Sequence, residues 1–271
     1  MSAQTVTVDG MGTVDLTFTD VGEGRPILLL HGGAGPQSMA GFAQMLTTRH
    51  PVHVYAPTLP GFNGTPRPDW LTNPRQVAKA LARLLDELNL MDITIIGNSI
   101  GGWIAAELAL TGTRRMRNVV LVDAGGIVVE GHPTADVFSL PPSELAKRSF
   151  HNPAAFPLNL ATMSDQQKAT MAANRATLVV YSGGPGMDDT SLRERLHQIR
   201  VPVLVVWGDS DQVVDPEYGR AYARSIPGAT FHLVPNAGHM PQIEAPDLLL
   251  RAIGEFMESE VTAAPSGPAG G

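Results

Sequence analysis

Apolar runs of strand length alternate along this chain with segments of helical periodicity. Buried strands are predicted by apolar runs, rich in β-branched residues and leucine, at residues 26–30, 52–56, 92–96, 118–123, 202–207 and 230–234. Two earlier runs, residues 5–8 and 14–21, predict an opening pair of strands joined by a glycine-containing turn. Near-continuous apolar strands that alternate with helices are typical of a mostly parallel sheet covered on both faces. The pattern therefore predicts an α/β fold.

Apolar side chains at helical spacing predict the helices between these strands. One helix begins at Asn73–Pro74, because proline suits the first helical position. Its inward face is formed by Val77, Leu81, Leu84, Leu85 and Leu88. A second helix follows residue 99 and stops near Gly112, and a last helix turns Leu249 and Ile253 inward.

The alternation breaks in the second half of the chain. We predict an α/β core from residues 1–130 and 199–260, interrupted by a helical cap at residues 131–198 with helices near 143–150 and 165–180. Long insertions in compact domains are often lids, and this one is expected to cover the carboxyl ends of the strands, where open α/β sheets bind ligands. Residues 261–271, rich in alanine, glycine and proline, are predicted to form a disordered tail.

Composition removes several classes of function. The 271 residues are 43% hydrophobic and 17% charged, as in an ordinary globular protein. The net charge of -7 and the lack of a basic run argue against a nucleic-acid or anionic-membrane partner. Without cysteine there is no disulfide, thiol nucleophile or cysteine-bound zinc. No signal peptide or membrane-spanning run is visible, so a cytoplasmic protein is expected, and a homodimer is left open.

The stretch IIGNSIGGW at residues 95–103 carries the first candidate for chemistry. It places Ser99 between a predicted strand and a predicted helix, with Gly97 and Gly101 leaving room for a strained turn. Ser99 could instead be a simple helix N-cap, or the glycines could cradle a dinucleotide phosphate. The G-x-G-x-x-G order is absent, which weakens the dinucleotide interpretation. We therefore favour Ser99 as a nucleophile.

Other predicted strand ends supply partners for such a serine. The HGGAGP loop after residue 30 offers the backbone N–H of Gly33 or Ala34, joined by that of Ile100, as an oxyanion hole, whereas the His31 side chain is expected to be structural. The WGDSDQVVD segment offers an acid, since it lacks the glycine and glutamate of a calcium loop. His239, in a loop before the last helix, is the predicted base. Ser99, Asp211 and His239 follow the chain order of nucleophile-elbow enzymes.

These motifs together resemble the α/β-hydrolase fold superfamily from about Pro26 to Ile253. The resemblance is carried by HGGAGP, PTLPGFNGTP, GNSIG, WGDSD and AGHMPQIEAP. It implies Ser99, Asp211 and His239 as catalytic residues, with Asp211 at the acid position of the family, although Asp123 ends a strand from which some relatives take their acid. A serine at the elbow argues against epoxide hydrolase and haloalkane dehalogenase activity. No cofactor or metal is implied.

Three functions are compatible with this resemblance. The first is cleavage of an ester of a small, mainly apolar molecule by a serine hydrolase. The second is carbon–carbon bond hydrolysis like that of the meta-cleavage product hydrolases, whose pattern Asn98 and Arg175 match, whereas Met240 stands where that family usually has tryptophan. The third is a slow or non-catalytic receptor-like module on the same fold. Asn98, Arg175, Trp103 and Met240 are the predicted substrate-binding residues, and on a helix Arg175 shares a stripe with Met171 and Val179.

Overall fold

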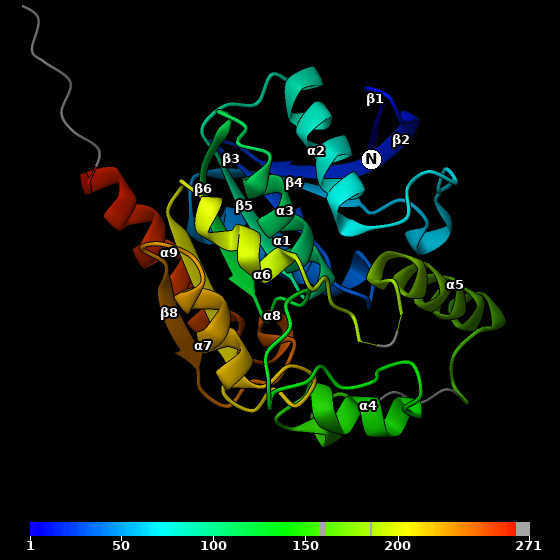
Figure 1. Ribbon diagram of the computed structural model, residues 1–271. Coiled ribbons are helices and arrows are strands. Elements are labelled where there is room, and N and C mark those ends of the chain that lie inside the picture. Colours follow the sequence, from blue (N-terminus) through cyan, green and yellow to red (C-terminus); the bar gives the residue numbers. More distant parts are fainter. Residues whose placement is uncertain (158–160, 185, 264–271) are drawn as a thin grey trace, which may run out of the picture.

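The computed structural model describes residues 1–157, 161–184 and 186–263, and one eight-stranded sheet forms its centre (Figure 1). The strands are β1 (Ser2–Val8), β2 (Gly12–Gly22), β3 (Arg25–Leu30), β4 (Val52–Thr58), β5 (Ile93–Asn98), β6 (Met116–Val122), β7 (Val203–Gly208) and β8 (Thr230–Val234). Their order in the sheet is β1-β2-β4-β3-β5-β6-β7-β8. The pairs β1–β2 and β2–β4 are antiparallel and all others are parallel, which confirms the predicted mostly parallel sheet.

Helices cover both faces of this sheet. The core helices are α1 (Gln37–Arg49), α2 (Pro74–Glu87), α3 (Ile100–Leu110), α7 (Pro216–Arg224), α8 (Pro241–Glu244) and α9 (Pro246–Ala263). Successive strand residues point to opposite faces, so Ile95 joins a cluster under α2, α3 and α7, while Ile96 joins a second cluster under α1 and α9. The apolar strands predicted from sequence are therefore buried on both sides.

The chain between β6 and β7 carries the elements of the predicted cap. They are α4 (Pro142–Ser149), α5 (Asp165–Ser182) and α6 (Leu192–Arg195). In Figure 1, α4 and α5 lie apart from the helices that flank the sheet. A capping box of Ser164 and Gln167 begins α5, and Gly183, with φ at 70°, ends it. The boundaries 131 and 198 of a separate cap stay a prediction.

Helix α5 is fastened to the core by polar side chains. Asn174 Oδ1 accepts from the Asn63 N–H at 2.7 Å, Thr177 donates to the Gly61 carbonyl at 2.9 Å, and the Tyr181 hydroxyl donates to the Pro60 carbonyl at 2.7 Å. We call Asn174, Thr177 and Tyr181 the α5 docking face. The predicted apolar stripe is not this face, because Val179 is 42% exposed and Met171 is half-buried.

A second tie joins α6 to the helix that follows Ser99. Arg195 binds the carboxylate of Glu107 on α3 with both terminal nitrogens, at 2.8 and 2.6 Å, and also binds Asp189 at 3.0 Å. The Glu107 side chain is only 2% exposed, so this pair is largely shielded from water.

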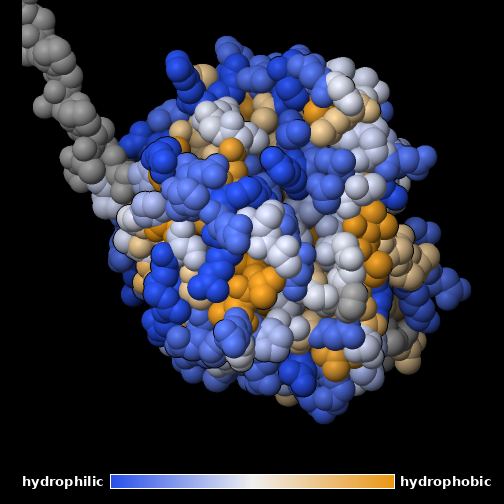
Figure 2. Space-filling model, viewed as in Figure 1, coloured by the Kyte–Doolittle hydropathy of each residue, from blue (hydrophilic) through white to orange (hydrophobic). Residues whose placement is uncertain are grey.

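The chain end and the surface complete the fold. Helix α9 extends to Ala263 and so overlaps the first three residues of the predicted tail, while residues 264–271 lie outside the described residues. Within the described ranges, no helix is long and apolar enough to cross a membrane. Figure 2 shows mostly hydrophilic side chains on one face, with smaller hydrophobic patches among them.

Candidate active site

Ser99 occupies a sharp turn between β5 and α3. Its backbone has φ 57° and ψ −121°, which L-residues rarely adopt. A side chain at Gly97 would collide with the Gly101 carbonyl, and a Cβ at Gly101 would lie 2.6 Å from the carbonyl oxygens of Leu30 and His31. The glycines on either side of Ser99 are therefore required by the close crossing of helix and strands, as the sequence predicted.

The hydroxyl of Ser99 is the end of a hydrogen-bonded chain through three strand ends. Its Oγ lies 2.9 Å from Nε2 of His239, and Nδ1 of His239 lies 2.8 Å from Oδ2 of Asp211. An ionised Asp211 can only accept, so Nδ1 carries the proton and Nε2 is left as the acceptor for the serine hydroxyl. The structure thus brings together the three residues predicted as catalytic.

Asp211 is held firmly in its loop. Its Oδ1 accepts from the N–H groups of Val213 at 2.7 Å and Val214 at 3.2 Å, and its side chain has no exposed surface. These bonds leave Oδ2 directed at His239. A carboxylate that receives several N–H groups is stabilised in its charged form, which suits a permanent partner for an imidazole.

Asp123, the alternative acid, lies beside this chain at the end of β6. It is fully buried, and its Oδ1 accepts from the Gly208 N–H at 2.9 Å. Burial, followed by the charge of Asp211, raises the pKa of its carboxyl well above the usual range. Among the described residues, only Asp123, Asp211 and His239 gather three possible metal-ligating atoms, within 4.8 Å of one another. Since His239 and Asp211 are already bonded to each other, we assign no metal to this group.

The predicted oxyanion loop follows β3. Gly33 is half-buried under Leu178 of α5, so close that a Cβ at Gly33 would lie 2.7 Å from a Leu178 methyl group. Ala34 is exposed in the same turn. Ile100 is the first residue of α3, where backbone N–H groups have no acceptor within the helix. These three positions remain the predicted oxyanion hole.

His31 has the structural role that the sequence suggested. It is fully buried, with Nδ1 hydrogen-bonded to the Gly32 carbonyl at 2.8 Å and Nε2 accepting from the Leu59 N–H at 3.0 Å. Burial lowers the pKa of His31 to about 4. Its neutral ring therefore ties the loop after β3 to the segment after β4.

The predicted substrate-binding residues of the core lie in different surroundings. Asn98 is buried, and its amide donates to the carbonyls of Val122 at 3.3 Å and His239 at 3.1 Å. Trp103 packs against Gly126 and lines a cavity of about 460 Å³. Met240 is half-buried directly after His239. Substrate contact by these residues stays a prediction, and Asn98 already has partners within the protein.

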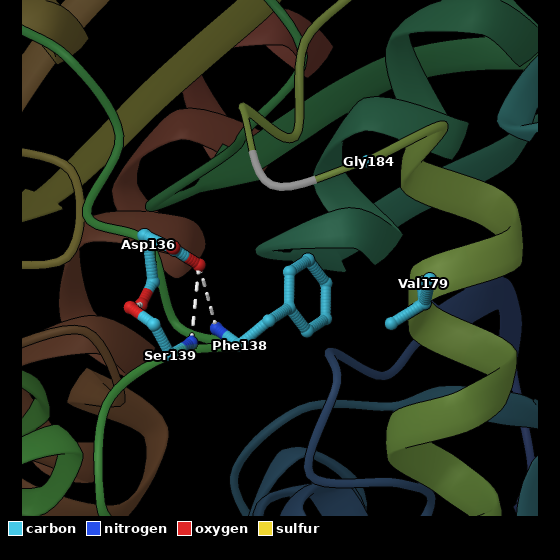
Figure 3. Close-up of a pocket in the computed structure, with 5 residues that line it drawn as sticks. All are labelled: Asp136, Phe138, Ser139, Val179 and Gly184. Atoms are coloured by element: carbon cyan, nitrogen blue, oxygen red, sulfur yellow. Dashed lines mark hydrogen bonds between the residues drawn. The ribbon is translucent and has the colours of Figure 1, made fainter.

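A small cavity opens between two segments of the chain that follows β6 (Figure 3). It has a volume of about 280 Å³ and is lined by Asp136, Phe138, Ser139, Val179 and Gly184. Figure 3 shows the Phe138 ring pointing across the opening toward Val179 of α5. On one side Ala135 donates to the Val213 carbonyl in the acid loop, and on the other side Leu178 covers Gly33. Residues next to the lining residues thus contact the loop at Gly33 and the loop at Val213, whereas Ser99, Asp211 and His239 are not among the residues that line the cavity.

Arg175 on α5 contacts the Phe138 segment but is not among the residues that line this cavity. Its guanidinium donates to the Phe138 carbonyl and stands 6.0 Å from the centroid of the Phe138 ring, and its charge acts on Asp136. The residue is exposed, so its cost in lost hydration is small. The structure does not bring Arg175 to the Ser99 hydroxyl, and its role as a substrate ligand stays a prediction.

Sequence reasoning missed the contacts that hold the histidine loop. Glu244 on α8 accepts from the N–H groups of Gly238 at 2.7 Å, His151 at 3.0 Å and Asn152 at 3.0 Å. The N–H of His239 itself donates to the carbonyl of Ser149, at the end of α4. Although Glu244 stands within the AGHMPQIEAP motif, its spacing gave no signal of this role, because two of its partners come from a distant segment.

The sheet order, the strand-to-helix turn at a serine and the Ser99–His239–Asp211 chain define the class of α/β-hydrolase-fold proteins. Residues 27–252 match the model of the alpha/beta hydrolase family, and the chain belongs to that family.

Known proteins similar to this chain include hydrolases of two kinds. A 2-hydroxy-6-oxo-2,4-heptadienoate hydrolase of Pseudomonas putida is 27% identical over 92% of this chain and 95% of its own length. Lipase 1 of Psychrobacter immobilis is 25% identical over 83% of this chain and 74% of its own length. The structure of a thermophilic esterase from Thermogutta terrifontis shares the fold, with a TM-score of 0.76 and 24% identity over 96% of this chain and 99% of that one.

Family membership and these relatives identify the chain as a hydrolase. The prediction of an enzyme is confirmed at that level, which sets aside the receptor-like module. The relatives do not distinguish ester cleavage from carbon–carbon cleavage, since both kinds occur among them at similar identity.

Proposed function

We propose that this protein is a serine hydrolase that cleaves an ester of a small, uncharged and mainly apolar molecule. The observation that supports the proposal most directly is the hydrogen-bonded chain from Ser99 through His239 to Asp211. A serine is a weak nucleophile unless an adjacent base removes its proton, and a base is useful only in the correct tautomer. Both requirements are met by this geometry.

The reaction has two halves. The Ser99 oxygen attacks the ester carbonyl carbon while Nε2 of His239 takes the hydroxyl proton, and the oxyanion is held by N–H groups of the loop at Gly33 and Ala34 and of Ile100. The C–O bond to the leaving alcohol then breaks as His239 returns the proton to that oxygen. Water, activated by the same histidine, hydrolyses the acyl-enzyme and restores Ser99.

We further propose that the acyl group extends toward the cavity between α5 and the Phe138 segment, whose lining suits an uncharged group. Phe138 and Val179 give it apolar surface, and no cationic side chain is among the described residues that line it. Arg175, the cation that the sequence predicted to bind substrate, is engaged by the Phe138 carbonyl.

The nucleophile is tested by Ser99→Ala, assayed on p-nitrophenyl esters of graded chain length. The variant should stay folded by circular dichroism and lose about 10⁵- to 10⁶-fold in kcat, because the remaining groups give only binding and oxyanion stabilisation. If a folded variant kept more than about a hundredth of the wild-type kcat, general acid–base catalysis without Ser99 could account for the reaction. Ser99 would then not be the nucleophile.

Carbon–carbon hydrolysis is the second candidate, favoured by the relatives that are named as hydrolases of 2-hydroxy-6-oxo-dienoates. Such substrates carry a carboxylate, so this function needs a cation at the site. Arg175→Ala separates the two candidates. Under the ester proposal it changes kcat/KM for neutral and acidic esters alike, because Arg175 supports the Phe138 segment.

A loss on the order of 10-fold or more that is confined to acidic substrates, as expected for a lost charge-assisted pair, would favour the carbon–carbon hydrolase. The assay should therefore place a dienone substrate with a carboxylate beside the neutral esters. Lys168→Ala, which removes another cation of the same helix, is the matched control.

A further inference from the structure

Asp123 is a buried acid next to the Ser99–His239–Asp211 chain that the hydrolytic steps above do not use. It follows β6 with a left-handed φ of 44°, and its N–H donates to the Val206 carbonyl of β7 at 3.0 Å. Its side chain faces two titratable groups, Asp211 and His239. A carboxyl group buried beside a second carboxyl group raises the question of its protonation state and hydrogen bonds.

The hydrogen bonds of the two carboxyl groups are unequal. Asp211 receives three N–H groups, two on Oδ1 and that of His239 on Oδ2, which is the pattern of a carboxylate. Asp123 receives one, from Gly208 on Oδ1. Its Oδ2 is buried and accepts from no donor among the described residues, and a carboxyl oxygen of Asp123 lies within 4.8 Å of one of Asp211. Between two carboxyl oxygens a hydrogen bond requires one proton.

That proton belongs on Asp123. Placed on Oδ2 of Asp211, it would compete with the N–H of His239 for the same oxygen. Placed on Oδ2 of Asp123, it satisfies the orphaned oxygen and gives Asp211 a further donor. Two ionised carboxylates buried side by side would repel each other strongly, so a shared proton is the lower-energy arrangement.

We propose that Asp123 is a positioning residue, which stays protonated in the working enzyme and donates a hydrogen bond from Oδ2 to the Asp211 carboxylate. This bond fixes the plane of Asp211 and thereby holds His239 in the tautomer that accepts the Ser99 proton. The inference rests on the proposed function insofar as Asp211 and His239 act in the reaction, whereas the protonation of Asp123 can be tested without turnover.

The kinetic test compares two substitutions at this one position. The amide introduced by Asp123→Asn can still accept from the Gly208 N–H and donate to Asp211, and asparagine tolerates a left-handed φ. Asp123→Gly keeps the backbone conformation accessible but removes both bonds. The control is Asp92→Gly, at an exposed aspartate with φ at 56° that precedes β5.

We expect Asp123→Gly to lower kcat for p-nitrophenyl butyrate by about 10- to 100-fold with little change in KM, the range for a lost hydrogen bond to a charged group. Asp123→Asn should stay within about threefold of the wild type, less than a neutral bond contributes. Asp92→Gly should leave kcat unchanged. If Asp123→Asn is as inactive as Asp123→Gly, the carboxylate form is required and the proposal is wrong. Equal kcat for Asp123→Gly and wild type would also overturn it, as would activity that EDTA removes and a divalent ion restores.

The protonation state is tested on the folded protein itself. A carboxyl kept protonated by the fold stabilises the native state below its unfolded pKa of 3.8, and this contribution is lost as pH rises. The Tm of Asp123→Asn should therefore exceed that of the wild type near pH 7, and the difference should shrink toward about pH 4.

The infrared difference spectrum between wild type and Asp123→Asn near neutral pH should contain the C=O stretch of a protonated carboxylic acid. A Tm difference that does not vary with pH, or a spectrum with only carboxylate bands, would contradict the proposal. If Ser99→Ala retained turnover, the proposed function would fail, yet these two measurements would still decide the state of Asp123.

Discussion

At the scale of single residues, the two side chains at the neighbouring ends of β5 and β6 both depend on strained backbone. Ser99 and Asp123 have φ values of 57° and 44°, which cost about 1 kcal/mol or more each in an L-residue. The N–H of Ser99 is held by the Val122 carbonyl of β6, and that of Asp123 by Val206 of β7. Each turn is thus held by the next strand, so the positions of the hydroxyl and the carboxyl follow the register of the sheet.

Replacing Asp211 by asparagine removes the charge of the side chain but keeps its shape. Asp211→Asn offers an amide where Nδ1–H of His239 needs an acceptor, which favours the wrong tautomer, and we expect kcat for esters to fall by about 10⁴-fold. Asp209→Asn, on the same loop but exposed, is the matched control and should retain activity. Steady-state turnover should be measured with both variants shown to be folded. A stronger effect at Asp123→Asn than at Asp211→Asn would reverse the assignment of the acid.

At this scale the sequence predicts what local motifs encode. The strained turn at Ser99 follows from its glycines, and the structural, hydrogen-bonded role of His31 follows from its place at the start of a Gly-rich turn. The relation of Asp123 to Asp211 and the contacts of Glu244 with Gly238 could not be predicted. Both features depend on which N–H groups of distant strands and helices lie beside these carboxyl groups. The spacing of residues along the chain does not predict those tertiary contacts.

At the scale of elements, α5 is attached to the core through hydroxyl and amide groups rather than apolar side chains alone. Tyr181→Phe removes the donor to the Pro60 carbonyl while keeping the buried ring. We expect the free energy of unfolding to fall by about 1–3 kcal/mol, because a buried carbonyl loses its partner. Urea unfolding followed by tryptophan fluorescence measures this loss.

Tyr222→Phe is the control for that change. Tyr222 is equally buried, but within the described residues its hydroxyl has no hydrogen-bond partner. Removing it should leave stability unchanged or raise it slightly. Equal losses at Tyr181 and Tyr222 would mean that the bond to Pro60 contributes nothing specific.

The elements themselves were predictable where one face is uniformly apolar. The buried strands and helices α2, α3 and α9 follow from hydrophobic spacing, whereas α5 was predicted as a helix but its docking face was not. Helices α1 and α7 were not predicted, and each contains a glycine that weakens the helical pattern. In α7 this is Gly219, where a Cβ would collide with the ring of Trp207. Tertiary packing against Trp207 therefore requires glycine at this position, and helix propensity alone could not predict it.

At the scale of the whole molecule, buried His31 makes the stability of the fold depend on acid. Between its unfolded pKa of 6.5 and its folded pKa of about 4, the unfolded chain binds a proton that the native protein does not. Stability is therefore present above pH 6.5 and lost as pH falls, by up to about 3 kcal/mol near pH 4.

Replacing this histidine by a group that does not titrate should flatten that dependence. In His31→Gln, the free energy of unfolding is expected to vary less between pH 6.5 and 4 than in the wild type, as measured by denaturant titrations at each pH. His197→Gln, at an exposed histidine, should keep the wild-type slope. An unchanged slope in His31→Gln would assign the acid sensitivity to other groups.

The attachment of α4 and α5 has a consequence for how this enzyme can be altered. On the core side, the bonded atoms of Pro60, Gly61, Asn63, Gln212 and His239 all belong to the main chain. Any sequence that keeps the backbone path of these loops presents the same atoms. A segment from a relative should therefore pack on this core if it carries the spacing of Asn174, Thr177 and Tyr181 and also provides partners for the carboxylates of Glu244 and Glu107. Exchanging the segment between β6 and β7 while the α/β core stays unchanged offers a route to new substrate selectivity that leaves the Ser99 turn untouched.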